Sequence, residues 1–101
     1  MVFAIVYAPG PCWKPGLSVW EQPLEAHGDY HYRLWSEGRV LHSGPFSDGS
    51  GAMSVVQVSN RLEAEALMEA DPAVVSGLLT AQLRPWFPVD WATYEPSTAT
   101  P

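Results

Sequence analysis

The chain has 101 residues, of which 47% are hydrophobic and five are tryptophan, a composition typical of one globular domain rather than a disordered segment. Its formal net charge is -6, and its five basic residues are scattered singly along the sequence. No basic patch is therefore available to neutralise a row of phosphates, which argues against a nucleic-acid partner.

Cysteine content and the first residues bear on the compartment. Cys12 is the only cysteine, so no intrachain disulfide can form, which fits a reducing compartment. The opening stretch, MVFAIVYAPG, is apolar but lacks a basic leader, and its proline and glycine end the run too early for a signal h-region or a membrane span. We expect a cytoplasmic protein with no membrane association.

The first predicted element is a strand over residues 2–8, an apolar run rich in β-branched and aromatic side chains. A run without alternation indicates a strand covered on both faces. Because the helices of so small a domain cover only one face of a sheet, we expect the other face to meet a second copy in a homodimer. The loop over residues 9–19 follows, and Trp13 and Trp20 indicate that it packs onto the domain.

The next predicted element is a helix with Pro23 in its first turn and Gly38 as its stop signal. The residues at i, i+3, i+7 and i+10 fall on one face of such a helix. In this chain they are Leu24, His27, His31 and Leu34.

A hairpin and a second helix follow. A strand over residues 39–43 ends at Gly44-Pro45, and a strand over residues 52–59 completes the hairpin. Asn60 and Glu63 have the spacing of a capping box at the start of a helix. The predicted apolar stripe of this helix consists of Leu62, Ala66, Leu67 and Ala70.

The chain closes with a short helix and a last strand. Asp71 caps a helical turn over residues 72–78, Pro72 takes its first position, and a strand follows over residues 80–87. This βαββαβ order predicts an α+β ferredoxin-like fold, with a four-stranded antiparallel sheet and two helices on one face. The domain spans residues 1–88, and residues 89–101 form a partly flexible tail in which Trp91 and Tyr94 are candidates for docking.

His27 is the main candidate for chemistry, because an imidazole titrates near neutral pH and can act as a general acid or base. The alternative is a core histidine whose ring is satisfied by a backbone carbonyl. Asp71 is the candidate partner, since one carboxylate oxygen can cap the helix while the other receives an imidazole N–H. The alternative for Asp71 is the capping role alone.

Other residues are candidates for the wall of a pocket. His31 has a metal-ligand spacing from His27, but HGDYH lacks the glutamate of a zincin motif and no further ligand cluster is evident, so we expect no metal. His31 is instead predicted to pack or to line the pocket. Ser43-Gly44-Pro45 either ends a strand or offers a hydroxyl to a small ligand. Tyr7 and Trp13 are predicted to line the pocket, with packing in the core or a dimer interface as the alternative.

Several of these residues follow one another in an ordered set: His27, Gly38, Ser43-Gly44-Pro45, Asp48-Gly49, Asp71-Pro72, Gly77-Leu78 and Arg84-Pro85-Trp86. With this set the chain resembles the YCII (YciI-like) family over residues 2–89. The resemblance implies a dimeric α/β barrel, a homodimer whose two sheets pack face to face, with a small-molecule cleft in each subunit. It implies an active-site pair at His27 and Asp71 and a pocket serine at Ser43.

The same resemblance bears on the reaction. One type of family member is a dehydrochlorinase of a chlorinated hydroxyhydroquinone, and muconolactone isomerase is a relative in the superfamily. We therefore expect a cofactor-independent lyase or isomerase acting on a small cyclic or phenolic substrate, by dehydration, dehydrohalogenation or a double-bond shift. The alternatives are a non-catalytic small-molecule-binding accessory protein and a cofactor-free monooxygenase. The loop over residues 9–20 and the tail after Trp86 depart from the family pattern and could reshape the pocket.

Overall fold

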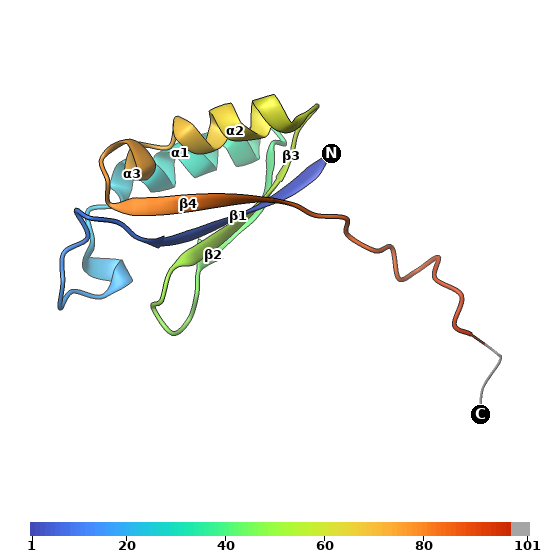
Figure 1. Ribbon diagram of the computed structural model, residues 1–101, viewed down its shortest axis with the longest axis horizontal. Coiled ribbons are helices and arrows are strands. Elements are labelled where there is room, and N and C mark those ends of the chain that lie inside the picture. The colour runs from blue at the N-terminus through green and yellow to red at the C-terminus, as the bar shows by residue number, and fades with distance from the viewer. Residues whose placement is uncertain (98–101) are drawn as a thin grey trace.

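The computed structural model describes residues 1–97, and the predicted order of elements is present (Figure 1). Within these residues, no helix is both long enough and apolar enough to cross a membrane. The α+β ferredoxin-like fold expected from the sequence is confirmed. Its elements are β1 (Val2–Pro9), the 3-10 turn η1 (Val19–Glu21), α1 (Glu25–Ser36), β2 (Val40–Pro45), β3 (Ala52–Gln57), α2 (Arg61–Glu69), α3 (Pro72–Val75) and β4 (Leu79–Pro85).

The strands form one antiparallel sheet in the order β2-β3-β1-β4, which leaves β2 and β4 at its edges. β2 pairs with β3 after an irregularity between Val40 and His42. Beyond this irregularity, Ser43 lies directly opposite Ser54. Side chains directly opposite one another on neighbouring strands point to the same face, so the hairpin brings two hydroxyls together.

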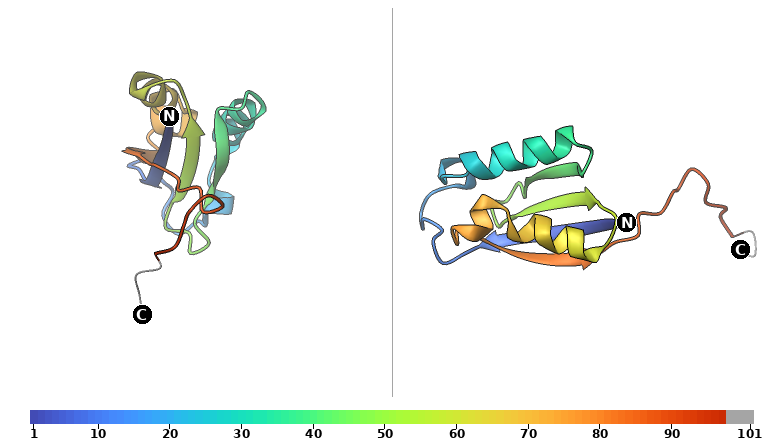
Figure 2. Two further views of the ribbon diagram at one scale, coloured as in Figure 1. Left: turned by 90° about the vertical axis from the view of Figure 1, so that its right-hand side faces the viewer. Right: turned by 90° about the horizontal axis from the view of Figure 1, so that it is seen from above.

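The helices cover one face of this sheet, with α1 next to β2 and with α2 and α3 next to β4 (Figures 1 and 2). Phe3, Ile5 and Tyr7 of β1 are almost completely buried beneath the helices, because alternate residues of a strand point to the same face. The residues between them, Ala4 and Val6, are only half-buried. They belong to the sheet face that the described helices leave open.

The loop between β1 and α1 is held by Gln22, which is buried although it is polar. Its Nε2 donates to the carbonyl oxygens of Lys14 at 2.8 Å and Leu17 at 3.2 Å, and its Oε1 accepts from the Lys14 N–H at 3.0 Å. A further turn follows Gln22, and α1 begins only at Glu25. The prediction that Pro23 lies in the first helical turn is therefore wrong.

Two predicted helix caps are confirmed. Asn60 Oδ1 accepts from the Glu63 N–H at 2.9 Å, and Asp71 Oδ1 accepts from the Ala73 N–H at 2.9 Å. The carboxylate of Glu63 turns back to the N–H of Ser59, one residue before the one that a capping box would use.

The predicted apolar stripe of α2 is wrong apart from Leu67. Ala64 and Leu67 are buried, whereas Leu62 is 76% exposed, and both Ala66 and Ala70 are exposed. The buried pair has the i, i+3 spacing of one helix face, and the small side chain at position 64 lets the helix approach the sheet closely. The predicted stripe included Leu62, which is large but exposed, and left out Ala64, which is small but buried.

The residues after β4 run away from the domain as an extended tail (Figure 1). Trp91 and Tyr94 contact each other, with ring centroids 4.9 Å apart, but are 70% and 53% exposed. In the described chain these rings are therefore not docked on the domain. Residues 98–101, the end of the segment predicted to be flexible, lie outside the described residues.

Candidate active site

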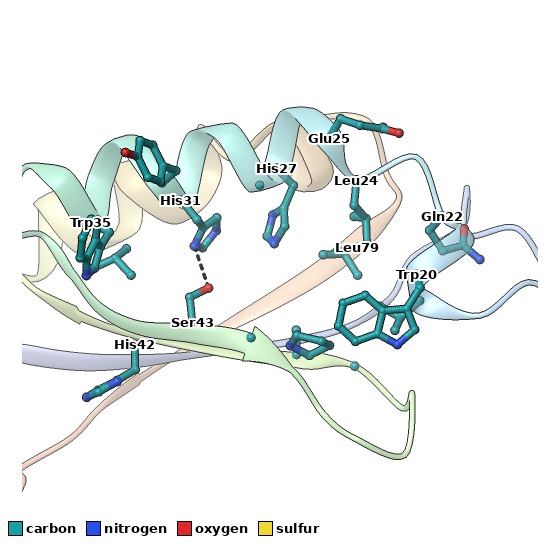
Figure 3. Close-up of a pocket in the computed structure, with 18 of the residues that line it drawn as sticks. Trp20, Gln22, Leu24, Glu25, His27, His31, Trp35, His42, Ser43 and Leu79 are labelled. Carbon is teal, nitrogen blue, oxygen red and sulfur yellow. Dashed lines mark hydrogen bonds between the residues drawn. The ribbon is translucent and has the colours of Figure 1, made fainter.

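A cleft of about 790 Å³ opens between α1 and β2 (Figure 3). His27 and His31 point into it from the helix, and Ser43-Gly44-Pro45 forms part of the opposite wall. Trp13 and Trp20, from the loop before α1, also line the cleft. The structure thus brings the candidate residues of the helix, the edge strand and the loop to one cavity.

The two histidines are neighbours because they lie one helical turn apart. Their ring centroids are 4.2 Å apart, with an angle of 48° between the rings. The side chain of His27 is 15% exposed and that of His31 is 7% exposed. His27 is therefore the more accessible of the two imidazoles.

Asp71 reaches both imidazoles from the junction of α2 and α3. It has no exposed surface, and its Oδ1 caps α3 through the Ala73 N–H. Nδ1 of His27 lies 2.8 Å from each carboxylate oxygen, and Nε2 of His31 lies 2.8 Å from Oδ2. The pairing of His27 with Asp71 is thus direct, and His31 takes part in the same cluster.

The ionisation of Asp71 sets the hydrogen-bond directions in this cluster. Burial by itself would raise the pKa of Asp71, but hydrogen bonds from His27, His31 and the Ala73 N–H outweigh burial and hold this pKa well below its usual range. An ionised carboxylate only accepts, so Nδ1 of His27 and Nε2 of His31 both donate to it. In the neutral rings, Nε2 of His27 and Nδ1 of His31 are left as acceptors.

Two serine hydroxyls surround the acceptor nitrogen of His31. Ser43 Oγ lies 3.1 Å and Ser54 Oγ 3.3 Å from Nδ1, and the hydroxyl oxygens lie 3.0 Å apart. Ser54 is buried, whereas Ser43 is exposed and lines the cleft. Ser54 was not predicted as a site residue, although it lies opposite Ser43 in the register of the hairpin.

Tyr7, predicted to line the pocket, lies one layer behind the cleft and is only 2% exposed. Its ring packs edge-on against His27 and His31, at centroid distances of 5.6 and 6.0 Å, and its hydroxyl lies 3.4 Å from Nε2 of His31. Burial raises the pKa of Tyr7, so the phenol stays protonated at neutral pH. Tyr7 therefore supports the histidines from behind.

His27, His31 and Asp71 also form a group that could hold a metal ion, since their ligand atoms all lie within 4.8 Å of one another. Each histidine, however, already directs an N–H at the carboxylate. The polar groups that these three side chains direct at one another are thus paired within the cluster.

Comparison with known proteins places the chain in a family. Residues 1–86 match the family model of the YCII-related domain. The chain belongs to the YCII family. Among curated proteins, it is similar to the uncharacterized protein YjpA of Bacillus subtilis (strain 168), with 32% identity over 66 residues that cover 65% of this chain and 78% of YjpA. The resemblance found in the sequence is confirmed.

The YCII chain is also similar to a solved structure. This is the 5-chloro-2-hydroxyhydroquinone dehydrochlorinase TftG of Burkholderia phenoliruptrix AC1100, in complex with 2,5-dihydroxybenzoquinone. The TM-score is 0.55, with 18% sequence identity over 86% of this chain and 94% of that one. At this identity, the likeness shows a shared fold.

Proposed function

We propose that this YCII chain is a lyase or isomerase that moves a proton on a small cyclic or phenolic substrate, with His27 as the base and Asp71 as its orienting partner. The observation that carries the proposal is the position of His27 Nδ1, 2.8 Å from both oxygens of Asp71, in a side chain that lines the cleft. Asp71 fixes the tautomer of His27 and favours the imidazolium that forms. His27 Nε2 is then the proton acceptor.

The lining of the cleft supports a flat and uncharged or phenolic substrate. Trp13, Trp20 and Trp35 offer aromatic surface, and no lysine or arginine lines the cleft within the described residues. A phosphorylated or polycarboxylate substrate would find no lysine or arginine among these lining residues to pair with. The fold is shared with a dehydrochlorinase that binds 2,5-dihydroxybenzoquinone, which is a ligand of this kind.

The reactions that fit need one base and no redox partner. In an elimination, Nε2 of His27 takes a proton from the substrate carbon or hydroxyl, a double bond forms, and the leaving group departs with the bonding electrons. Hydroxide takes the proton back from the imidazolium and leaves as water, whereas halide leaves as the anion and the imidazolium gives its proton to solvent. In a double-bond shift, the same imidazolium returns the proton to another carbon. Positioned acid–base catalysis of this kind contributes roughly 10²–10⁴-fold to the rate. The protein residues alone supply these steps.

A chloride-release assay tests this function. The purified protein is incubated without oxygen with 5-chloro-2-hydroxyhydroquinone, and chloride release is followed, while an unsaturated lactone in D₂O is followed by NMR for a double-bond shift. Turnover that His27→Gln abolishes supports the proposal. Turnover that is equal in wild type and His27→Gln contradicts it.

The exposed aromatic side chains at the cleft favour a second candidate function, that of a non-catalytic small-molecule-binding protein. Trp20 is 81% exposed and Trp35 57% exposed, and both line the cleft. Aromatic surface of this kind binds a flat ring whether or not chemistry follows. Saturable binding of 2,5-dihydroxybenzoquinone, with no product from either 5-chloro-2-hydroxyhydroquinone or the unsaturated lactone, supports this candidate.

We also propose that the protein acts as a homodimer through the open face of the sheet. Ala4 and Val6 of β1 lie opposite Val55 and Met53 of β3 and form the apolar centre of this face. Met53 is 40% exposed. On β4 the same face carries Thr80, Gln82 and Arg84, which gives an apolar centre with a polar border, as in interfaces between subunits.

A further inference from the structure

We propose that Ser43 is a second reactive group of the cleft, a nucleophile activated by His31 and acylated by small activated acyl compounds such as aryl esters and thioesters. This activity differs from the proton transfer assigned to His27. It rests on a line of hydrogen bonds that runs from the cleft to the buried carboxylate.

The line consists of a hydroxyl, an imidazole and a carboxylate. Ser43 Oγ lies 3.1 Å from Nδ1 of His31, and Nε2 of the same ring lies 2.8 Å from Oδ2 of Asp71. Because Asp71 receives the N–H of Nε2, Nδ1 carries the lone pair that accepts the serine proton. A nucleophile within reach of a base that a third group orients is the arrangement that activates serine.

Burial divides this line into a protected part and a reactive part. Asp71 is 0% and His31 is 6% exposed, so base and orienting group are shielded from water. Ser43 lies on the edge strand, is exposed, and lines the cleft, where its hydrogen bond to His31 is visible (Figure 3). A reagent in the cleft can therefore reach the oxygen of Ser43 without displacing the base.

Ser54 provides the matched control. Its hydroxyl lies 3.3 Å from the same nitrogen and 3.0 Å from the hydroxyl of Ser43. It is only 1% exposed, so a reagent in the cleft cannot contact it. The two serines thus share one base and differ in access.

The proposed reaction balances with water as its only co-reactant. Ser43 Oγ attacks the carbonyl carbon, a C–O bond forms, and the hydroxyl proton passes to Nδ1 of His31. The bond to the aryl oxide or thiolate then breaks, and the leaving group takes that proton. Water attacks the acyl-serine in the same way, giving its proton through His31 back to Ser43 and releasing a carboxylic acid. Nothing is oxidised or reduced. Aryl esters and thioesters fit best, because their leaving groups are stable anions.

The experiment uses p-nitrophenyl acetate, with p-nitrophenolate release as the readout, and a fluorophosphonate with mass-spectrometric mapping of the labelled residue. We expect the label on Ser43, its loss in Ser43→Ala, and its retention in Ser54→Ala. His31→Gln should slow acylation by roughly 10²–10⁴-fold, the contribution of a general base. Ser43→Cys should restore acylation, and urea unfolding of each variant checks its fold.

Three outcomes would overturn the inference: a label on another residue, acylation of Ser43→Ala at the wild-type rate, or equal loss of label in Ser54→Ala and Ser43→Ala. If His31→Gln fails to fold, the comparison of Ser43→Ala with Ser43→Cys still tests the role of Ser43. Both variants should fold, because Ser43 is exposed on an edge strand. Acylation is read without any cyclic substrate. Proton transfer without acylation therefore counts against this inference alone, and acylation without proton transfer counts against the proposed function alone.

Discussion

Oδ2 of Asp71 lies 2.8 Å from Nε2 of His31, so the carboxylate that orients His27 also orients a second imidazole. One buried charge therefore fixes the tautomers of two rings and leaves two acceptor nitrogens, Nε2 of His27 in the cleft and Nδ1 of His31 beside Ser43. A change at Asp71 acts on both rings, whereas a change at either histidine acts on one.

His27→Gln should lower the turnover number for chloride release or double-bond shift by roughly 10²–10⁴-fold, because the amide cannot take the proton. The KM should change little, since glutamine fills most of the same space. Steady-state kinetics on the substrate that the wild type turns over in the chloride-release or double-bond-shift assay check this. Ser54→Ala is the control, because its hydroxyl is buried away from the cleft. A loss of kcat/KM in His27→Gln that comes entirely from a higher KM would instead assign His27 to substrate binding.

Asp71→Asn should destabilise the protein at neutral pH by roughly 1–3 kcal/mol, because buried hydrogen-bonding groups lose an acceptor. The effect should depend on pH with a definite sign. The pKa of Asp71 is lower in the folded protein than its ordinary value near 3.9, so its ionisation stabilises the fold above that value. This stabilisation is lost as pH falls through the lower, folded-state pKa.

Urea unfolding of wild type and Asp71→Asn from neutral pH down into the acid range measures this dependence. The difference in the free energy of unfolding should shrink as pH falls below the ordinary aspartate pKa. A difference that grows as pH falls below that value would contradict the ionised state assigned to Asp71.

The sequence predicts those features of this molecule that depend on residues near one another in the chain. His27, His31 and Leu34 share a face because helical periodicity is local, and Asp71 is marked as a cap by the proline after it. The sharing of Asp71 between two rings depends on how far α3 lies from α1, which no periodicity encodes. Ser54 is a polar residue in an apolar strand, and only the hairpin register gives it a partner.

Glycine positions give a matched pair of stability predictions. A Cβ at Gly51 would overlap the backbone carbonyl oxygen of Tyr7, whereas a Cβ at Gly28 would meet no atom within 4 Å. Gly51→Ala should therefore cost about 1–3 kcal/mol through overpacking. Gly28→Ala, within α1, should gain up to about 1 kcal/mol from helix propensity. Thermal or urea unfolding of both variants checks the opposite signs, and a stabilised Gly51→Ala would contradict the close approach to Tyr7.

If the cleft binds 2,5-dihydroxybenzoquinone as proposed, Trp20→Ala should weaken that binding, because the ring lines the cleft. It should leave stability almost unchanged, because the ring is 81% exposed. An aromatic contact contributes about 0.5–1.5 kcal/mol, which corresponds to a roughly 2- to 12-fold rise in Kd. Isothermal titration calorimetry measures this rise. Trp91→Ala is the control, since that exposed tryptophan lies in the tail and does not line the cleft within the described residues. An equal loss of affinity in both variants would show that the effect is not specific to the cleft.

The open face of the sheet gives the last prediction. If a second copy covers Val6 and Met53, Met53→Lys places an ammonium in an apolar interface, where an unpaired charge costs several kcal/mol. Such a cost corresponds to a rise in the dimer dissociation constant of roughly 100-fold or more. Size-exclusion chromatography with light scattering over a concentration series should therefore show a wild-type dimer and a Met53→Lys monomer.

Leu62→Lys introduces the same charge on α2, at a leucine that is 76% exposed, and should leave the dimer intact. A wild-type chain that stays monomeric at the highest concentration, or a Leu62→Lys variant that dissociates as readily as Met53→Lys, would remove this face as the interface.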